Sequence, residues 1–116
     1  MKILVADDEH MIRDILVDLL REKGFDVTSA NDGLEAWSSI ESQDFDIVIL
    51  DESMPGLRGS DIALRLLAMP EHPQILMVTG HQDLVSSLSR RVTLLSKPFT
   101  IPVFLAAVNN LVSAKC

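Results

Sequence analysis

Five polar residues that could share one chemical task each stand at the end of a short apolar segment. Asp7 and Asp8 follow the first segment, and Asp51 follows the third. Thr79 ends the fourth segment and Lys97 ends the fifth. The carboxyl ends of parallel strands meet at one edge of a sheet, and open sheets of this kind bind ligands there. The pattern therefore predicts that three carboxylates, a hydroxyl and an ammonium group lie together.

Such a group of residues suits phosphoryl chemistry. Three neighbouring carboxylates repel each other, so each is costly to ionise unless a cation is present. A site with oxygen ligands only, few of them from the protein, suits Mg²⁺. Together with Lys97, Mg²⁺ would offset the negative charge and let one carboxylate act as nucleophile, forming an aspartyl-phosphate. We expect Asp51 to be that nucleophile because it stands alone on its strand, and Asp7 and Asp8 to hold the ion.

Each of these residues also has an ordinary structural interpretation. The stretch Asp7-Asp8-Glu9 could cap a following helix and complement its dipole. Asp51 could cap the turn before Pro55-Gly56. Thr79 could be a β-branched strand residue, and Lys97 could be solvated. Taken one at a time these interpretations are the commoner ones, but they do not explain why all five residues fall at strand ends around one edge.

Strand-like and helix-like segments alternate along the chain. The expected strands are the apolar runs Ile3–Ala6, Phe25–Ser29, Ile47–Leu50, Ile75–Val78 and Val92–Leu95. Helical spacing predicts a first helix whose apolar stripe is Ile12, Ile15, Leu16, Leu19 and Leu20. Gly24 is expected to end this helix in the left-handed conformation. The later helices carry the stripes Leu34, Trp37 and Ile40; Ile62, Leu66 and Met69; and Phe104, Ala107, Val108 and Leu111.

This alternation predicts an α/β fold, a doubly wound parallel sheet with helices on both faces. The strands need no polar alternation because such a sheet is buried on both sides. Five strands in one sheet suggest the flavodoxin-like order 2-1-3-4-5. Strand order then reverses between the first and third strands, next to Asp7, Asp8 and Asp51.

Length and composition exclude several classes of protein. The chain has 116 residues, 47% of them apolar, which fits one domain over residues 1–116 and argues against a disordered chain. No apolar run approaches the about 20 residues of a membrane helix, and Asp7-Asp8-Glu9 interrupts the N-terminal run before it could form a signal peptide. The net charge of −7 argues against a nucleic-acid surface. With Cys116 as its only cysteine, the chain is expected in the cytoplasm.

Taken together, these residues resemble a response regulator receiver domain of two-component signalling. The resemblance covers essentially the whole chain and rests on Asp7-Asp8, the stretch Ala30–Ala36, Asp51 with Met54-Pro55-Gly56, Gly59 and Asp61, Thr79, and Lys97-Pro98-Phe99. It implies that Asp51 accepts a phosphoryl group from a histidine kinase or a histidine phosphotransfer protein. It also implies that Mg²⁺ is bound by Asp7, Asp8, Asp51 and the backbone carbonyl of Ser53.

The same resemblance implies roles for the remaining residues. Thr79 would hydrogen-bond the phosphoryl group and Lys97 would pair with it. A cis peptide is implied between Lys97 and Pro98, although only about 5–6% of X-Pro bonds are cis. Ser53 and His81 occupy positions that tune dephosphorylation. Such a domain is no enzyme in the usual sense: it catalyses only its own phosphorylation and dephosphorylation, and it switches between two conformations that bind different partners.

Two features depart from the family pattern. Thr79 and Lys97 are 18 positions apart, about one helical turn shorter than is usual. The fourth helix, expected within Gln82–Arg91, should therefore be short. Leu94 stands where many receivers have a switching Tyr or Phe. These departures leave the phosphoryl chemistry alone and bear on the surface that signals to partners.

Two other functions stay open at this point. A small phosphatase with an aspartyl nucleophile, similar to haloacid-dehalogenase-like enzymes, would carry Asp-x-Asp after its first strand, whereas here the acidic residues are contiguous. A receiver-like scaffold that works without phosphorylation would not need all five residues at the predicted edge. The residues identify neither the cognate kinase nor the downstream target. They also do not distinguish a free-standing receiver from one within a larger regulator or hybrid kinase.

Overall fold

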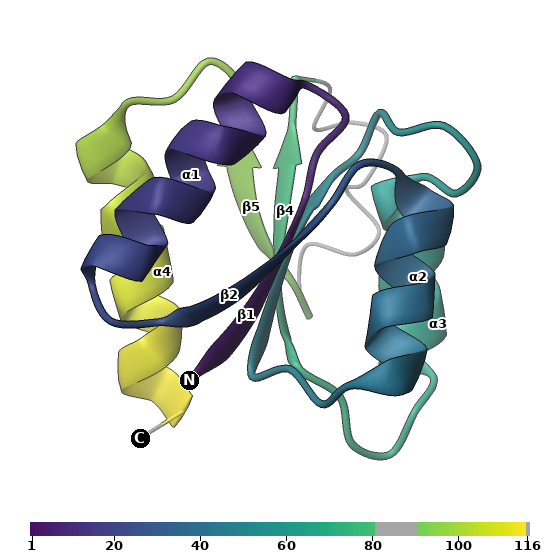
Figure 1. Cartoon of the computed structure of the whole chain (residues 1–116). Helices are drawn as coiled ribbons and strands as arrows, with labels where there is room; N and C mark the ends of the chain where they lie inside the picture. Colours follow the sequence, from purple (N-terminus) through teal and green to yellow (C-terminus); the bar gives the residue numbers. More distant parts are fainter. Residues whose placement is uncertain (81–90, 116) are drawn as a thin grey trace.

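A five-stranded parallel sheet with helices on both faces forms the protein (Figure 1). The structure is a computed structural model that describes residues 1–80 and 91–115. Its strands are β1 (Lys2–Ala6), β2 (Asp26–Ala30), β3 (Ile47–Asp51), β4 (Gln74–Thr79) and β5 (Thr93–Ser96). Its helices are α1 (His10–Glu22), α2 (Gly33–Ser42), α3 (Gly59–Leu67) and α4 (Ile101–Lys115). The order β2-β1-β3-β4-β5 confirms the predicted doubly wound topology.

The fourth helix predicted within Gln82–Arg91 falls on residues 81–90, which lie outside the described part of the chain. The strand predictions are correct to within one residue at every end. β5 is shifted by one residue relative to the expected Val92–Leu95 and runs from Thr93 to Ser96.

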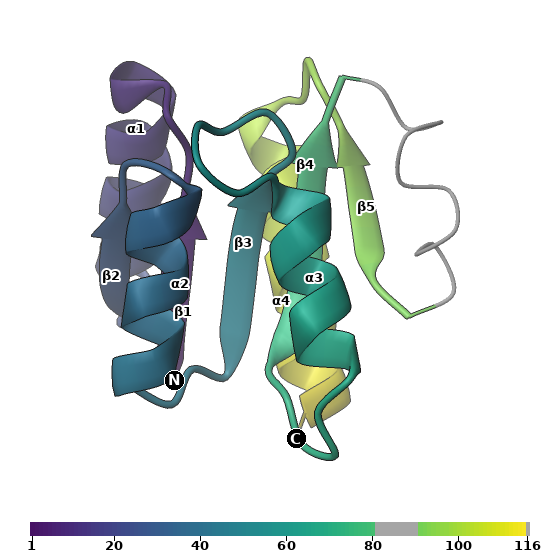
Figure 2. The same cartoon turned by 90° about the vertical axis from the view of Figure 1, so that its right-hand side faces the viewer.

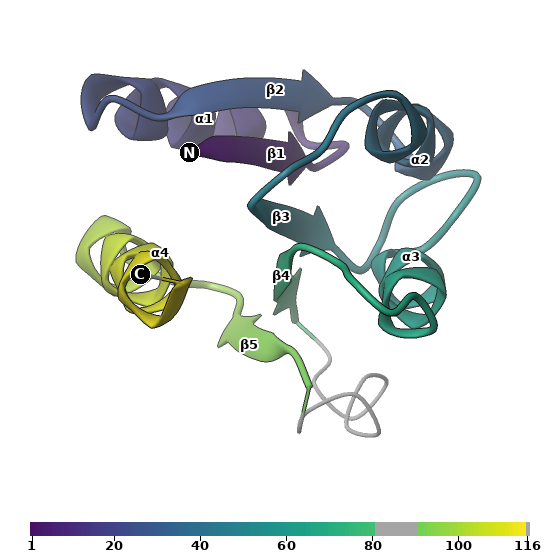
Figure 3. The ribbon, with the colours of Figure 1, turned by 90° about the horizontal axis from the view of Figure 1, so that it is seen from below.

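The sheet separates two hydrophobic cores. Successive residues of a strand point to opposite faces, so each inner strand supplies both cores. On one face Leu4, Val48 and Leu50 pack with α2 and α3. On the other face Ile3, Val5, Ile47 and Ile49 pack with α1 and α4. The two helix pairs are seen on opposite sides of the sheet in Figures 1 and 3.

The buried stripe of α1 was predicted correctly only in part, because some of its residues lie one position further along the chain than expected. Ile15 is 49% exposed, whereas Arg13 and Val17 are buried beside the correctly predicted Leu16 and Leu20. The buried set Arg13, Leu16, Val17 and Leu20 has the spacing i, i+3, i+4, i+7, which is as regular as the predicted one. Apolar spacing alone therefore could not choose between two overlapping stripes.

Two further stripe residues are exposed instead of buried. Leu34, 62% exposed, lies over the loop at Gly56, where an added Cβ would meet the Leu34 Cγ at 2.7 Å. Ala36 takes the buried place on α2, and Trp37 packs against that core from its edge. Met69, 40% exposed, falls beyond the end of α3, because a helix usually ends before the residue preceding a proline and Pro70 follows.

The parallel register brings the carboxyl ends of the inner strands to one edge. Ala6 of β1 pairs with Leu50 of β3, so Asp7 and Asp51 are the next residues of their strands at that edge. Asp51 in turn pairs with Val78, and Thr79 pairs with Ser96. Figure 2 shows the strands pointing the same way, toward the loops that lead into α1 and α3.

Gly33 lets the start of α2 pack directly against the loop between β3 and α3. Its amide donates to the Pro55 carbonyl over 3.1 Å. A Cβ added at Gly33 would stand 1.9 Å from the Leu57 carbonyl oxygen, which is backbone and cannot rotate away. The loop that follows Asp51 is thereby fixed to α2.

We expect Gly33→Ala to lower the free energy of unfolding by about 3 kcal/mol, because a buried methyl group must displace backbone. Gly80→Ala is the matched control, since a Cβ there has no atom within 4 Å, and we expect it to change stability by less than about 0.5 kcal/mol. Urea unfolding of both variants measures the difference. Equal stabilities would show that the loop yields easily and that the close approach does not constrain it.

Candidate functional site

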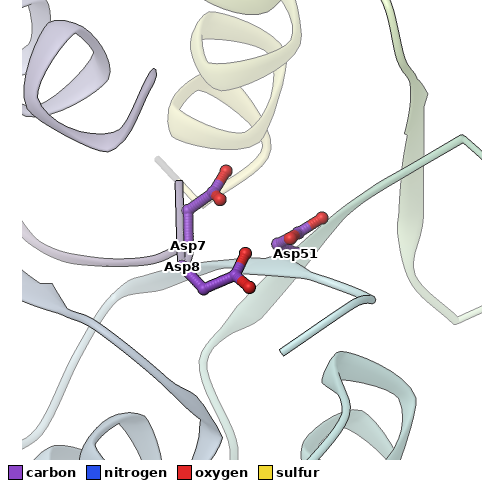
Figure 4. Close-up of side chains that lie close together, drawn as sticks. All are labelled: Asp7, Asp8 and Asp51. Carbon is purple, nitrogen blue, oxygen red and sulfur yellow. The ribbon is translucent and has the colours of Figure 1, made fainter. Parts of the chain in front are cut away.

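Three carboxylates meet at the edge of the sheet, as the sequence predicted. Asp7, Asp8 and Asp51 each offer one oxygen, and these oxygens all lie within 4.8 Å of one another (Figure 4). Asp7 and Asp51 are both 3% exposed, whereas Asp8 faces solvent. Two buried carboxylates and one open one form a site that is anchored in the sheet and accessible from outside.

Lys97 joins this cluster from the end of β5. Its Nζ lies 3.1 Å from Asp51 Oδ1 and 3.7 Å from Asp7 Oδ2. It also lies 3.2 Å from Glu9 Oε1, a contact across 88 positions of sequence. The sequence pattern indicated only a capping role for Glu9 and did not reveal this contact. No signal in the local sequence could have revealed it, because it depends on where the loop after β5 passes.

The capping interpretation of the acidic stretch is only partly correct. Glu9 is the N-cap residue of α1, but its side chain makes no capping hydrogen bond. Instead, Asp7 Oδ1 accepts from the Glu9 amide over 2.9 Å. This bond leaves the other Asp7 oxygen directed at Lys97, so the turn organises the cluster in addition to starting the helix.

Thr79 ends β4 at the same edge, and its side chain is almost fully buried. The Thr79 carbonyl accepts from the Lys97 amide over 2.9 Å. The ends of β4 and β5 are therefore connected at the two residues expected to contact a phosphoryl group. The peptide between Lys97 and Pro98 is cis, as the resemblance implied.

Ser53 lies in the loop after β3, and its neighbour Glu52 holds that loop. The buried Glu52 carboxylate accepts from the Ser60 amide over 2.6 Å and from the Ser60 hydroxyl over 2.9 Å. The Glu52 carbonyl accepts from the Gly59 amide over 3.2 Å. No feature of the sequence pattern indicated this role of Glu52, because the contact spans eight residues and depends on the path of the loop. Ser53 itself is exposed, and its role as a ligand stays a prediction.

Burial and like charge make the carboxylates reluctant to ionise. Burial, followed by the charge of Asp7, raises the pKa of Asp51 from 3.8 to about 6, although Lys97 acts in the opposite direction. Burial also raises the pKa of Asp7. Burial alone would lower the pKa of Lys97, but its hydrogen bond to Asp51 and the nearby negative charges outweigh this effect and raise it.

The donor set fits a hard divalent cation. The three closely spaced groups are carboxylates, and oxygen donors are the ligands that such cations prefer. A cation would also relieve the repulsion that raises the pKa values of Asp7 and Asp51. The geometry therefore supports cation binding by Asp7, Asp8 and Asp51, with the Lys97 ammonium group beside Asp7 and Asp51.

No helix in the described ranges is long and apolar enough to cross a membrane.

Comparison with known proteins identifies the family. The model of the response regulator receiver domain family matches residues 3–109. The chain is 37% identical to the chemotaxis protein CheY-3 of Vibrio cholerae over 107 residues, which cover 86% of this chain and 82% of that protein. The chain therefore belongs to the response regulator receiver domains.

Solved structures agree with this assignment. The receiver domain of the Francisella response regulator 1452 matches with a TM-score of 0.89 at 28% identity, covering 99% of this chain and 98% of that one. TrrA of Thermotoga maritima, solved in complex with Mg(2+)-BeF, matches with a TM-score of 0.84 at 32% identity, covering 95% and 97%. The phosphatase and scaffold alternatives are not favoured by these matches.

The raised pKa of Asp51 predicts a specific pH dependence of stability without metal. Below pH 3.8 the Asp51 carboxyl is protonated in both the folded and the unfolded chain. Between pH 3.8 and about 6 the unfolded chain loses the proton first, so rising pH favours unfolding, and above pH 6 the full cost persists. Asp51→Asn removes this cost. We expect it to raise Tm at pH 7.5 by about 4–12 °C, the equivalent of about 1–3 kcal/mol, and by clearly less at pH 4.5.

Thermal melts in EDTA at both pH values test this expectation, with Asp18→Asn on the exposed side of α1 as the control variant. An Asp51→Asn effect of the same size at both pH values would contradict it.

Proposed function

We propose that this receiver domain accepts a phosphoryl group on Asp51 and that phosphorylation shifts a two-state conformational switch that changes partner binding. In this proposal Asp7, Asp8, Asp51 and the backbone carbonyl of Ser53 hold Mg²⁺. The main support is the meeting of three carboxylates with the Lys97 ammonium group at one sheet edge. The Mg(2+)-BeF complex of TrrA, a domain 32% identical to this one, supports magnesium as the ion.

Asp51 is suited to act as the nucleophile. With a pKa of about 6 it is ionised at neutral pH, and a carboxylate oxygen is then available to attack phosphorus. A new O–P bond forms as the bond between phosphorus and the donor's nitrogen or oxygen breaks, and the donor leaves with the bonding electrons. Mg²⁺, when bound, supplies positive charge that offsets the transferred phosphoryl oxygens. Lys97 stabilises the same oxygens and is already within 3.1 Å of Asp51.

The switch would depend on Thr79 and Lys97 acting together. Moving a two-state domain from mostly inactive to mostly active needs about 5.5 kcal/mol of differential binding. One charge-assisted hydrogen bond contributes roughly 1.5–3 kcal/mol, so Thr79 alone is insufficient. The backbone bond between the Thr79 carbonyl and the Lys97 amide connects the two residues, so that a movement of one affects the other.

The donor in this proposal is a histidine kinase or a histidine phosphotransfer protein in the cytoplasm. The name of one relative, sporulation initiation phosphotransferase F of Bacillus subtilis, supports a role in phosphoryl transfer between proteins. The domain turns over no small substrate in this proposal and catalyses only its own phosphorylation and dephosphorylation. Ser53 would tune the latter from its exposed position beside Asp51; His81 lies outside the described residues.

Incubation with Mg²⁺ and a small acyl phosphate tests the chemistry. We expect intact mass spectrometry to show one phosphoryl adduct that is stable in acid and labile in base, because it is an acyl phosphate. Asp51→Asn should abolish the adduct, and omission of Mg²⁺ should reduce it strongly. An adduct that persists in Asp51→Asn would move the site of phosphorylation elsewhere.

Thr79→Ala should separate phosphorylation from the conformational response. We expect this variant to take up the phosphoryl group at nearly the rate of the wild type, because in this proposal the Thr79 hydrogen bond forms to the phosphoryl group after its transfer. The amide chemical-shift changes of β4 and β5 that accompany phosphorylation should shrink by more than half. Thr79→Ser keeps the hydroxyl group and should restore them. Unchanged shifts in phosphorylated Thr79→Ala would assign the response to Lys97 alone.

A further inference from the structure

Arg13 is a buried cation where the packing of α1 calls for an apolar side chain. It continues the buried stripe of Leu16, Val17 and Leu20, yet it carries a guanidinium group and is only 8% exposed. Burying a charge costs several kcal/mol, and an apolar residue of similar size is often as stable or more stable in such a place. Its ion pair with Asp14, 3.6 Å away, does not require burial, because the Asp14 side chain is 68% exposed. Stability therefore does not explain why an arginine stands here.

Arg13 contacts the backbone of the cluster formed by Asp7, Asp8 and Asp51. Arg13 Nη1 donates to the Asp7 carbonyl over 3.3 Å and also to the side-chain oxygen of Asn31. Arg13 Nη2 contacts His10 Nδ1 at 2.9 Å. A guanidinium group has only donors, held in a rigid plane, so these bonds fix its orientation. The group thus connects the turn after β1 with the loop after β2.

The Asp7 carbonyl belongs to the peptide that joins Asp7 to Asp8. A rotation of that peptide would move both carboxylates. The Asp7 side chain is held independently by the Glu9 amide and by Lys97. Within residues 1–80 and 91–115, no hydrogen bond or ion pair holds the Asp8 carboxylate, so its position depends on the backbone.

Asn31 anchors the far side of Arg13. Its side-chain nitrogen donates to Glu35 Oε2 over 3.1 Å, and the next residue, Asp32, caps α2 by accepting from the Glu35 amide over 2.8 Å. The start of α2 therefore supports Asn31, and Asn31 supports the guanidinium group. This gives a physical role to a residue that entered the sequence analysis only as part of a family motif.

We infer that Arg13, anchored by Asn31, is a positioning residue that holds the Asp7–Asp8 peptide so that both carboxylates face one divalent cation. The inference rests on the proposed function, because the cation is the one that the proposed phosphorylation uses. Groups that orient metal ligands from behind typically affect metal affinity by about 10–100-fold. The effect of Arg13 should therefore appear in binding of the ion itself, before any phosphoryl transfer.

Arg21, an exposed arginine on the same helix, provides a control for the loss of a bond to backbone. Its Nη2 donates to the Val27 carbonyl over 3.0 Å, so it also connects α1 to β2 through a backbone oxygen. It does so near the beginning of β2, whereas Asn31 follows the end of that strand, on the side of the acidic cluster. Arg21 is exposed, so its loss should remove a bond between α1 and β2 with little loss of packing and without disturbing the Asp7–Asp8 turn.

The experiment is a titration of the metal-free full chain with Mg²⁺, followed by amide chemical shifts. These spectra report the dissociation constant and the integrity of the fold together. We expect Arg13→Met to raise the dissociation constant about tenfold, and Arg21→Met to leave it within about twofold. Asn31→Ala should raise it in the same direction as Arg13→Met. The double variant Arg13→Met/Asn31→Ala should be no weaker than Arg13→Met alone, because the two residues act as one unit.

A folded Arg13→Met variant that binds Mg²⁺ as the wild type does would overturn the inference. So would an equal loss in Arg21→Met, because the role of Arg13 would then be structural. If Arg13→Met does not fold, Asn31→Ala decides: unchanged affinity overturns the inference and a weakened one supports it. If the wild type shows no response to Mg²⁺, the metal site of the proposed function is overturned, and the role of Arg13 with it. The wild-type titration alone therefore distinguishes failure of the proposed function from failure of the inference about Arg13.

Discussion

The main constraint on this structure is that two buried carboxylates, those of Asp7 and Asp51, lie next to each other at the edge of the sheet. Neither group ionises easily there, as their raised pKa values show. The compensation comes from a distant part of the chain, since Lys97 reaches the pair only because β5 lies parallel to β4 and ends at the same edge. The positive charge that balances the two carboxylates is therefore present only because the sheet has this topology.

Beyond the contacts that the carboxylates make themselves, neighbouring residues hold the backbone from which they project. After β3, the Glu52 side chain connects the following loop to the start of α3 through Ser60. After β1, the Asp7 carbonyl accepts a hydrogen bond from Arg13 of α1. Gly33 brings the start of α2 against the same β3–α3 loop. A site at the ends of strands needs such support, because the loops that follow are otherwise the most mobile parts of a domain.

The parts of this arrangement that follow from strand order could be predicted, and the parts that follow from loop paths could not. Asp7, Asp8, Asp51 and Lys97 converge because parallel strands end together, which the alternation of segments already indicates. The contact between Glu9 and Lys97 depends on the course of a loop, which no periodicity describes. The burial of Arg13 was missed for another reason. Two overlapping sets of residues in α1 have helical spacing, and the one that is buried contains Arg13. A charged residue in that set made it look like the exposed face.

The division of the interior by the sheet has a consequence for how such a domain diversifies. Side chains that pack α2 and α3 belong to one cluster, and those that pack α1 and α4 belong to the other, with the strand backbones between them. Substitutions that reshape one side leave the packing opposite largely undisturbed. Surfaces on the two sides can therefore change separately from each other and from the acidic edge that they share.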